Sequence, residues 1–156
     1  MMGADVLAAL EASFLGQTAR ASTWLFPLSN LAHVLGAGLL VGSIAVFDIL
    51  LLRRRYDAAA AVASSALPLA ATGIVMLALS GPVLFSAEAT ALGRNPVFLT
   101  KMTLISAAFF NIAAYYAAAW REKVDSGFPT RARVHAGISL TLWIMVLLAG
   151  RLIAYV

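Results

Sequence analysis

The chain has 156 residues, of which 62% are hydrophobic and 12% are charged, with a mean hydropathy of +0.92. Soluble domains average about 45–50% apolar and about 25% charged residues, so this composition excludes a water-soluble single domain. The lack of cysteine excludes disulfides, thiolate metal sites and cysteine nucleophiles. The net charge of +4 comes from short basic clusters between apolar runs, which is typical of a membrane protein and not of a nucleic-acid binder.

Residues 1–23 are predicted to form a short helix on the membrane surface. They contain Asp5 and Glu11 before any long apolar run, which is not the pattern of a signal peptide. Apolar residues recur on one helical face, at Val6, Leu7, Leu10 and Phe14. This spacing predicts an amphipathic interfacial helix, and Trp24 then marks the headgroup level.

Four apolar stretches are each long enough to cross the hydrocarbon core, which needs about 20 residues at a rise of ~1.5 Å per residue. They are continuous and rich in Ala and Leu, which favours helices over the alternating strands of a β-barrel. We predict spans at about 27–52, 62–85, 97–120 and 134–155. The expected fold is therefore an all-α membrane protein, a four-transmembrane-helix bundle that forms one domain over residues 1–156.

Small residues and prolines indicate how the spans pack. Gly38 and Gly42 form a small-xxx-small pair, which lets another backbone approach closely in lipid. That backbone belongs either to a neighbouring span or to a second copy of the chain in a homo-oligomer; alternatively, the glycines make room for a flat cofactor beside His33. Pro68 is expected to bend the second span, and Pro82 to mark its outer end.

Basic residues are distributed unequally between the two sides of the predicted bundle. Seven of the eleven follow the first and third spans, namely Arg53, Arg54, Arg55, Arg121, Lys123, Arg131 and Arg133. The other four are Arg20, Arg94, Lys101 and Arg151. Because basic loops stay in the cytoplasm, we expect the loops after the first and third spans to face the cytoplasm. Both termini are then expected on the outer side of the cytoplasmic membrane.

The ionisable residues inside the spans are functional hypotheses, because charge in lipid is costly. His33 lies ~9 Å below the outer boundary, and Lys101 and Arg151 belong to the same outer layer. Asn30 shares a helix face with His33. We expect His33 to face the bundle, where it either hydrogen-bonds a carbonyl or a neighbour such as Asn111, or ligates a metal.

Three methionines, Met76, Met102 and Met145, also fall in the outer half. Imidazole and thioether together bind haem iron or copper, although methionine is also an ordinary gap filler in helix bundles. The cations Lys101 and Arg151 suit haem propionates or an anionic substrate. The candidate cofactor-binding residues are therefore His33, Asn30, Lys101 and Arg151, with His33 and the methionines as candidate metal ligands.

Asp48, Arg133 and His135 belong to the opposite, inner layer. A haem with two histidine ligands needs both rings at nearly equal depth, since each nitrogen approaches the iron to about 2 Å. His33 and His135 are ~20 Å apart along the membrane normal, so they do not share one haem. We predict instead that Asp48, His135 and Arg133 form a structural polar cluster at the cytoplasmic rim.

Several short signatures occur in order along all four spans. They are Trp24-Leu25-Phe26-Pro27 with His33, Gly42-Ser43-Ile44 with Phe47-Asp48, Asn95-Pro96-Val97-Phe98 with Lys101-Met102, and Trp143 with Gly150-Arg151-Leu152-Ile153-Ala154-Tyr155. Over nearly the whole chain they resemble the DUF6644-type proteins, small four-helix bacterial inner-membrane proteins of unassigned function. The resemblance implies a location in the bacterial inner membrane.

More distantly, the chain is similar to the membrane domains of CopD-type copper-resistance proteins and of HemJ-type protoporphyrinogen oxidases. Those proteins share a histidine in an early span and a lysine that opens a later one, which the HemJ-type enzymes associate with haem b and porphyrin oxidation. The resemblance implies that His33 is an axial ligand and Lys101 a propionate or substrate partner. The chain departs from the family pattern at Asn30 and Leu50, where many relatives carry glutamate and arginine. It also departs at Tyr115 and Tyr116, where some relatives carry a histidine.

Three functions from different classes stay open at this point. The first is a protein that binds haem b or a porphyrin in its outer half and has a redox role. The second is a permease for copper or a small solute, and the third is a structural or assembly subunit without chemistry. Whether the chain is an enzyme is left open, and the expected partners are the lipid bilayer and a second copy through Gly38 and Gly42.

Overall fold

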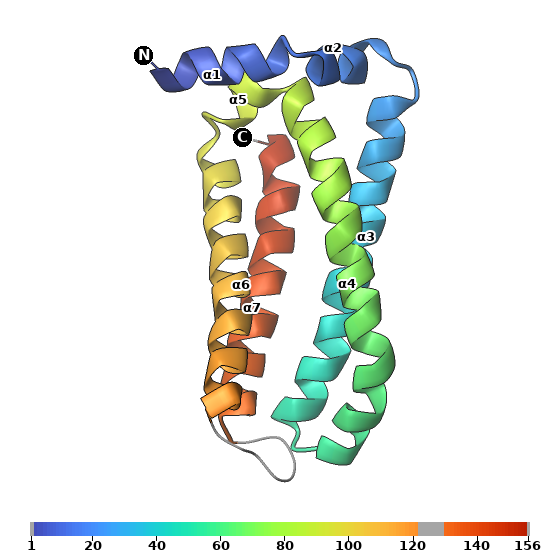
Figure 1. Cartoon of the computed structure of the whole chain (residues 1–156), viewed down its shortest axis with the longest axis vertical. Helices are drawn as coiled ribbons and strands as arrows, with labels where there is room; N and C mark the ends of the chain where they lie inside the picture. Colours follow the sequence, from blue (N-terminus) through green and yellow to red (C-terminus); the bar gives the residue numbers. More distant parts are fainter. Residues whose placement is uncertain (1, 122–129, 156) are drawn as a thin grey trace.

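The computed structural model describes residues 2–121 and 130–155, and within these ranges the chain is almost entirely helical with no strand. This confirms the predicted all-α fold. The elements are labelled in Figure 1 and are α1 (Met2–Glu11), α2 (Phe14–Ala21), α3 (Leu25–Leu52), α4 (Tyr56–Ala87), α5 (Ala89–Leu92), α6 (Pro96–Arg121), α7 (Thr130–Leu152) and the 3₁₀ turn η1 (Ile153–Tyr155).

Within the described ranges, four helices are long and apolar enough to cross a membrane, namely α3, α4, α6 and α7. They lie side by side with alternating direction (Figure 1), which is the predicted four-helix bundle. Many large apolar side chains on their outer surfaces are exposed, among them Val34, Leu79 and Phe110. A membrane-spanning helix presents such side chains to lipid, so contact with the bilayer follows from this surface.

Helix α4 extends beyond the predicted second span at both ends. It begins at Tyr56 because residues 58–61 are alanines, the strongest helix formers. At its other end it continues through Pro82 to Ala87, although Pro82 is predicted to end the span. Proline is tolerated inside a membrane helix because neighbouring helices and polar side chains compensate for the backbone hydrogen bond that it removes.

The closest approach between helices lies where α3 meets α4. A Cβ atom added to Gly36 would lie 2.9 Å from the Gly73 carbonyl oxygen, and one added to Gly73 would lie 2.5 Å from the Gly36 oxygen. Only glycine permits this backbone contact. A Cβ atom added to Gly38 or Gly42 would meet nothing within 4 Å. The expected contact between Gly38–Gly42 and a neighbouring span is therefore wrong, because this face of α3 points away from the chain's other helices.

Some neighbouring helices of the bundle pack more closely against each other than others do. α3 packs against α4, α7 packs against α6, and α3 packs against α7, whereas α4 and α6 are not closely packed against each other. Each of the four spanning helices contributes to one apolar core, formed by Leu40, Val41, Ala70, Ala108, Trp143 and Val146. At the end of the bundle where α4 ends and α6 begins, the rings of Phe85 and Phe98 stack between these two helices, with centroids 5.4 Å apart.

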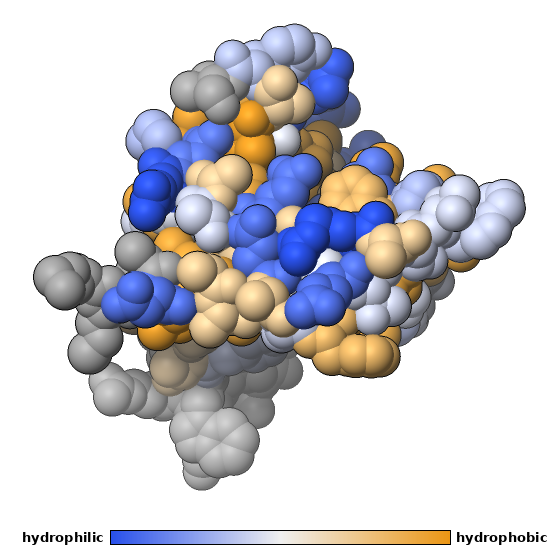
Figure 2. Space-filling model, turned by 90° about the horizontal axis from the view of Figure 1, so that it is seen from above, coloured by the Kyte–Doolittle hydropathy of each residue, from blue (hydrophilic) through white to orange (hydrophobic). Residues whose placement is uncertain are grey.

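Helices α1, α2 and α5 lie across one end of the bundle, which we call the platform end (Figure 1). The helices α1 and α2 are separate, because the Ser13 hydroxyl caps α2 by accepting the Gly16 N–H and also donates to the Leu10 carbonyl oxygen. The predicted single interfacial helix is thus two short helices. Seen from this end, hydrophilic residues occupy the middle of the face (Figure 2).

Polar contacts join the helices of the platform to one another and to α4. A Glu11 carboxylate oxygen accepts the Thr90 backbone N–H at 2.9 Å. The Arg20 guanidinium donates to the Ala87 carbonyl oxygen at 3.0 Å and to that of Glu11 at 2.6 Å. The Thr90 N–H is also the main cause that lowers the pKa of Glu11, with further contributions from the Thr90 side chain and Arg20. We call the opposite end, with Arg53, the basic end.

Candidate functional site

His33 lies on α3 in the platform-side half of the bundle and is half-buried. Its Nδ1 atom is 2.9 Å from the Ser80 hydroxyl oxygen on α4. The Ser80 hydroxyl in turn donates to the Met76 carbonyl oxygen at 2.6 Å. Because a hydroxyl has one hydrogen, Ser80 accepts from His33, and Nδ1 carries the proton. In the neutral ring, Nε2 then holds the free lone pair.

The His33 ring lies against the backbone of α4. A Cβ atom added to Gly81 would come within 3.6 Å of the His33 Cε1 atom. Nε2 makes no hydrogen bond within residues 2–121 and 130–155. The hydrogen bond from Nδ1 therefore fixes the orientation of the His33 ring. The lone pair of Nε2 is free to bind a ligand from outside the chain.

Lys101 on α6 lies near His33 and acts on it electrostatically. Its side chain lies along Gly150 of α7, where an added Cβ atom would be 3.5 Å from Nζ and 3.6 Å from Cε. Among the residues that the structure describes, Lys101 makes no ion pair. We call His33, Ser80 and Lys101 the His33 site; with Gly150, it draws on all four spanning helices.

The other two residues predicted for this site are exposed. Asn30 is exposed on the outer surface of α3. Arg151 is exposed as well, where it donates to the Tyr155 hydroxyl at 2.6 Å and lies 5.0 Å from the centre of that ring. Of the predicted set of four, the structure brings together His33 and Lys101.

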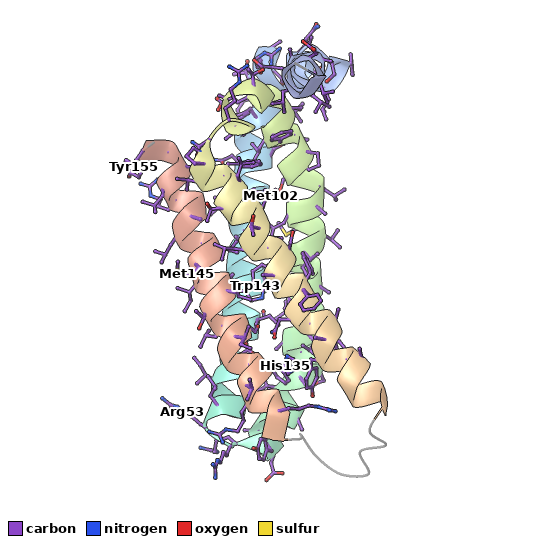
Figure 3. The ribbon with its side chains drawn as sticks, turned by 90° about the vertical axis from the view of Figure 1, so that its left-hand side faces the viewer. Arg53, Met102, His135, Trp143, Met145 and Tyr155 are labelled. Atoms are coloured by element: carbon purple, nitrogen blue, oxygen red, sulfur yellow. The ribbon has the colours of Figure 1, made fainter. Side chains whose placement is uncertain are left out.

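The methionines do not gather around His33. Met102 on α6 and Met145 on α7 are each 45% exposed on the outer surface of the bundle, and both are labelled in Figure 3. Met76 is half-buried, and its Cβ atom lies where α3 and α4 approach each other at Gly36. Their positions are those of side chains that face lipid or fill a gap.

Asp48 is a buried acid in the half of the bundle nearer the basic end, and it is only 4% exposed. Its carboxyl group lies close to the Ser139 side chain on α7. Its Oδ2 atom has no hydrogen-bond partner in the described part of the chain. Among the described residues, Asp48 forms no ion pair with Arg133.

His135 is joined to α6 and not to Asp48. Its Nδ1 donates to the Asn111 side-chain oxygen at 2.8 Å, and the Asn111 amide donates back to the His135 carbonyl oxygen at 3.0 Å. The Tyr115 ring meets the His135 ring edge-on, with centroids 5.6 Å apart. Asn111, considered as a partner of His33, belongs here, and the predicted polar cluster divides into Asp48–Ser139 and His135–Asn111.

Ser80 and Ser139 are polar neighbours of His33 and Asp48 that the sequence does not mark. Serine in a membrane helix is common, because its hydroxyl can donate to a carbonyl one turn earlier. The sequence signal that could have identified Ser80 is depth, since Ser80 lies near the platform end of α4 just as His33 lies near that of α3.

In the described ranges, no three His, Asp or Glu side chains come together as a metal-binding group.

Four apolar spans with polar side chains between them define the class of this molecule, an integral membrane protein built as a four-helix bundle. Comparisons with protein-family models, with curated proteins and with solved structures find no match. The geometry of the polar residues therefore carries the functional argument.

Proposed function

We propose that this protein binds haem b or a related porphyrin in the platform-side half of its bundle. His33 Nε2 would ligate the iron, and the Lys101 ammonium would pair with a carboxylate of the macrocycle. The observation that supports this most strongly is the hydrogen bond from His33 Nδ1 to Ser80, which leaves Nε2 free. Histidines that ligate metals typically donate their other ring N–H in this way, which fixes the ring and raises its basicity.

The donor set suits a haem with one protein ligand. An imidazole with a free Nε2 and an ammonium without a carboxylate partner match iron and propionate, respectively. His135 is bound to Asn111 in the other half, and the exposed methionines supply no second ligand. Bound haem would supply one-electron chemistry, while Ser80 orients the imidazole and Lys101 neutralises negative charge.

The seam between α4 and α6 is the route that we propose for the ligand. These helices are not closely packed against each other, and the stacked rings of Phe85 and Phe98 cover the platform end of the seam. A flat apolar molecule dissolved in the bilayer would enter laterally, below these rings, and reach His33 and Lys101. Access from lipid suits a porphyrin better than it suits a free copper ion, which would come from water.

The absorbance spectrum of the detergent-purified protein, reconstituted with haem, tests this function. We expect a Soret band that is lost in His33→Gln and retained in His135→Gln, a matched control with the other histidine. A folded wild-type protein without the band, or a band that survives in His33→Gln, would contradict the proposal. Copper found by elemental analysis in place of haem would favour the permease instead.

We further propose that the basic end faces the cytoplasm of a bacterial inner membrane, so that both termini lie outside. The support is the sequence, in which seven of the eleven basic residues follow the first and third spans. Because the chain has no cysteine, single cysteines give a clean test. A cysteine at Arg54 should resist an impermeant thiol reagent in intact cells, whereas one at Ala91 should react; the reverse result would contradict this orientation.

The open glycine face of α3 supports a second proposal about partners, a homo-oligomer through Gly38 and Gly42. No helix of the described chain covers these glycines, so another backbone could approach them closely. Crosslinking in membranes should yield a dimer that Gly42→Leu removes. Unchanged crosslinking in that variant would exclude this face as the interface.

A further inference from the structure

A shallow groove of about 440 Å³ runs along the outer surface of α7 in the half nearer the basic end. It is lined by Arg133, Val134, Gly137, Ile138, Thr141 and Leu142. From Arg133 to Thr141 the helix rises ~12 Å, so the groove follows the helix axis from the basic end toward the middle of the bundle. It is separate from the His33 site, whose residues lie on other helices and in the other half.

The lining of this groove is polar at one end and apolar along the rest. Arg133 supplies the charge, while Val134 and Ile138 are 62% and 44% exposed. The Thr141 hydroxyl donates to the Gly137 carbonyl oxygen at 2.9 Å, so its hydrogen is already used within the helix. The groove thus suits a molecule with an anionic head at the basic end and an apolar tail toward the middle of the membrane.

Further positive charge lies beside the polar end. A Cβ atom added to Gly137 would lie 3.7 Å from the Leu52 Cδ2 atom, which places the end of α3 beside the groove. Arg53 follows Leu52 directly and is exposed, and Figure 3 shows it at this end of the molecule. The Arg133 Nε atom is buried without a hydrogen-bond partner in the part of the chain that the structure describes. Arg133 and Arg53 therefore both lie at the polar end of the groove.

We propose that this groove binds an anionic phospholipid, with its phosphate on Arg133 and Arg53 and an acyl chain over Gly137. The absent side chain of Gly137 makes room for the chain, and basic residues at a membrane interface attract anionic headgroups. A second copy of the protein is a poorer occupant. A copy in the same orientation would bring its own Arg53 and Arg133 to the same depth, and like charges would repel.

Thermal unfolding of the purified protein in mixed micelles tests the proposal, with phosphatidylglycerol compared against phosphatidylcholine of identical acyl chains. We expect phosphatidylglycerol to raise the Tm of the wild type more, and native mass spectrometry to show it bound. Arg133→Gln should weaken phosphatidylglycerol binding about fivefold, since one arginine near an anionic lipid contributes about 1 kcal/mol. Arg94→Gln is the matched control, because it removes an exposed arginine at the platform end.

A second variant tests the apolar part of the groove. Gly137→Leu should remove binding of both lipids, and it should fold, because a Cβ atom at Gly137 makes only an ordinary contact with Leu52. Equal effects of the two lipids on the wild type, or full phosphatidylglycerol binding in Arg133→Gln, would overturn the proposal. So would a wild-type dimer that Gly137→Leu converts to a monomer, since the occupant would then be a second copy.

Discussion

The two histidines of this bundle lie in opposite halves. They differ in whether the polar groups around them all have partners. Each donates its Nδ1 hydrogen to a side-chain oxygen on a neighbouring helix, which is Ser80 for His33 and Asn111 for His135. Asn111 returns a hydrogen bond to the His135 backbone, so that pair is reciprocal. Beside His33, by contrast, lies an ammonium group without an ion-pair partner in the described ranges.

This difference separates a structural role from a binding role. Buried polar groups in a membrane are stable when their hydrogen bonds are satisfied, and the reciprocal His135–Asn111 pair is a fixed connection between α6 and α7. An uncompensated charge at Lys101 is costly, and such residues in spans are candidates for ligand binding. Variants that affect stability at one histidine and ligand affinity at the other would sharpen the comparison.

The largest loss of stability is expected for Asn111→Leu. This change leaves the buried Nδ1 hydrogen of His135 without an acceptor, and an unsatisfied buried group costs about 1–3 kcal/mol. Thermal unfolding in detergent should show the loss, while haem binding at His33 stays as in the wild type. Replacing both partners, Asn111→Leu with His135→Leu, should recover much of the stability. A double variant that is as unstable as Asn111→Leu would contradict the reciprocal pair as the cause.

Ser80→Ala should cost less stability, about 1 kcal/mol, but should reduce haem affinity about 10–100-fold, because His33 loses the group that orients it. Ser106→Ala is its control, since the Ser106 hydroxyl also donates to the carbonyl one turn earlier but receives no histidine. Haem titration followed by absorbance measures both variants. Equal affinities for the two would show that Ser80 does not position the ring.

Lys101→Met keeps most of the length of the side chain and removes the charge. We expect stability to stay within about 0.5 kcal/mol of the wild type or to rise, because an unpaired ammonium in lipid is itself unfavourable. Haem affinity should fall, and a porphyrin whose propionates are esterified should bind wild type and variant equally. A clear loss of stability without any change in affinity would instead make Lys101 a structural residue like Asn111.

The smallest effect is expected at the platform, where Glu11 is partly exposed to solvent. Its pKa is lowered in the folded state, mainly by the Thr90 N–H, so the carboxylate stabilises the fold above its unfolded pKa. This contribution disappears as the pH falls below about 4. The protection factor of the Thr90 amide, which compares its exchange rate with the intrinsic rate at the same pH, should fall over that range, and Glu11→Gln should remove this pH dependence. The same fall of the protection factor in Glu11→Gln would point to another group.

The spans and the relative depth of His33 and Lys101 could be predicted, because helix length and rise are fixed by the backbone and by the thickness of a bilayer. The rotation of each helix could not, since it depends on which faces pack together. Gly36 and Gly38 look equivalent in the sequence, yet only Gly36 meets α4. Asn111 lies ~22 Å from the start of α6, against ~12 Å for His33 along α3, so depth alone argues against pairing those two residues.

The four spans alternate in direction, and this has a practical consequence for experiments in cells. The first described helix and the last turn, Ile153–Tyr155, both lie at the platform end (Figure 1). Reporter enzymes fused before α1 and after η1 should therefore become active in one and the same compartment. A pair of fusions with opposite readings would reveal that one hydrophobic segment fails to traverse the bilayer in living cells.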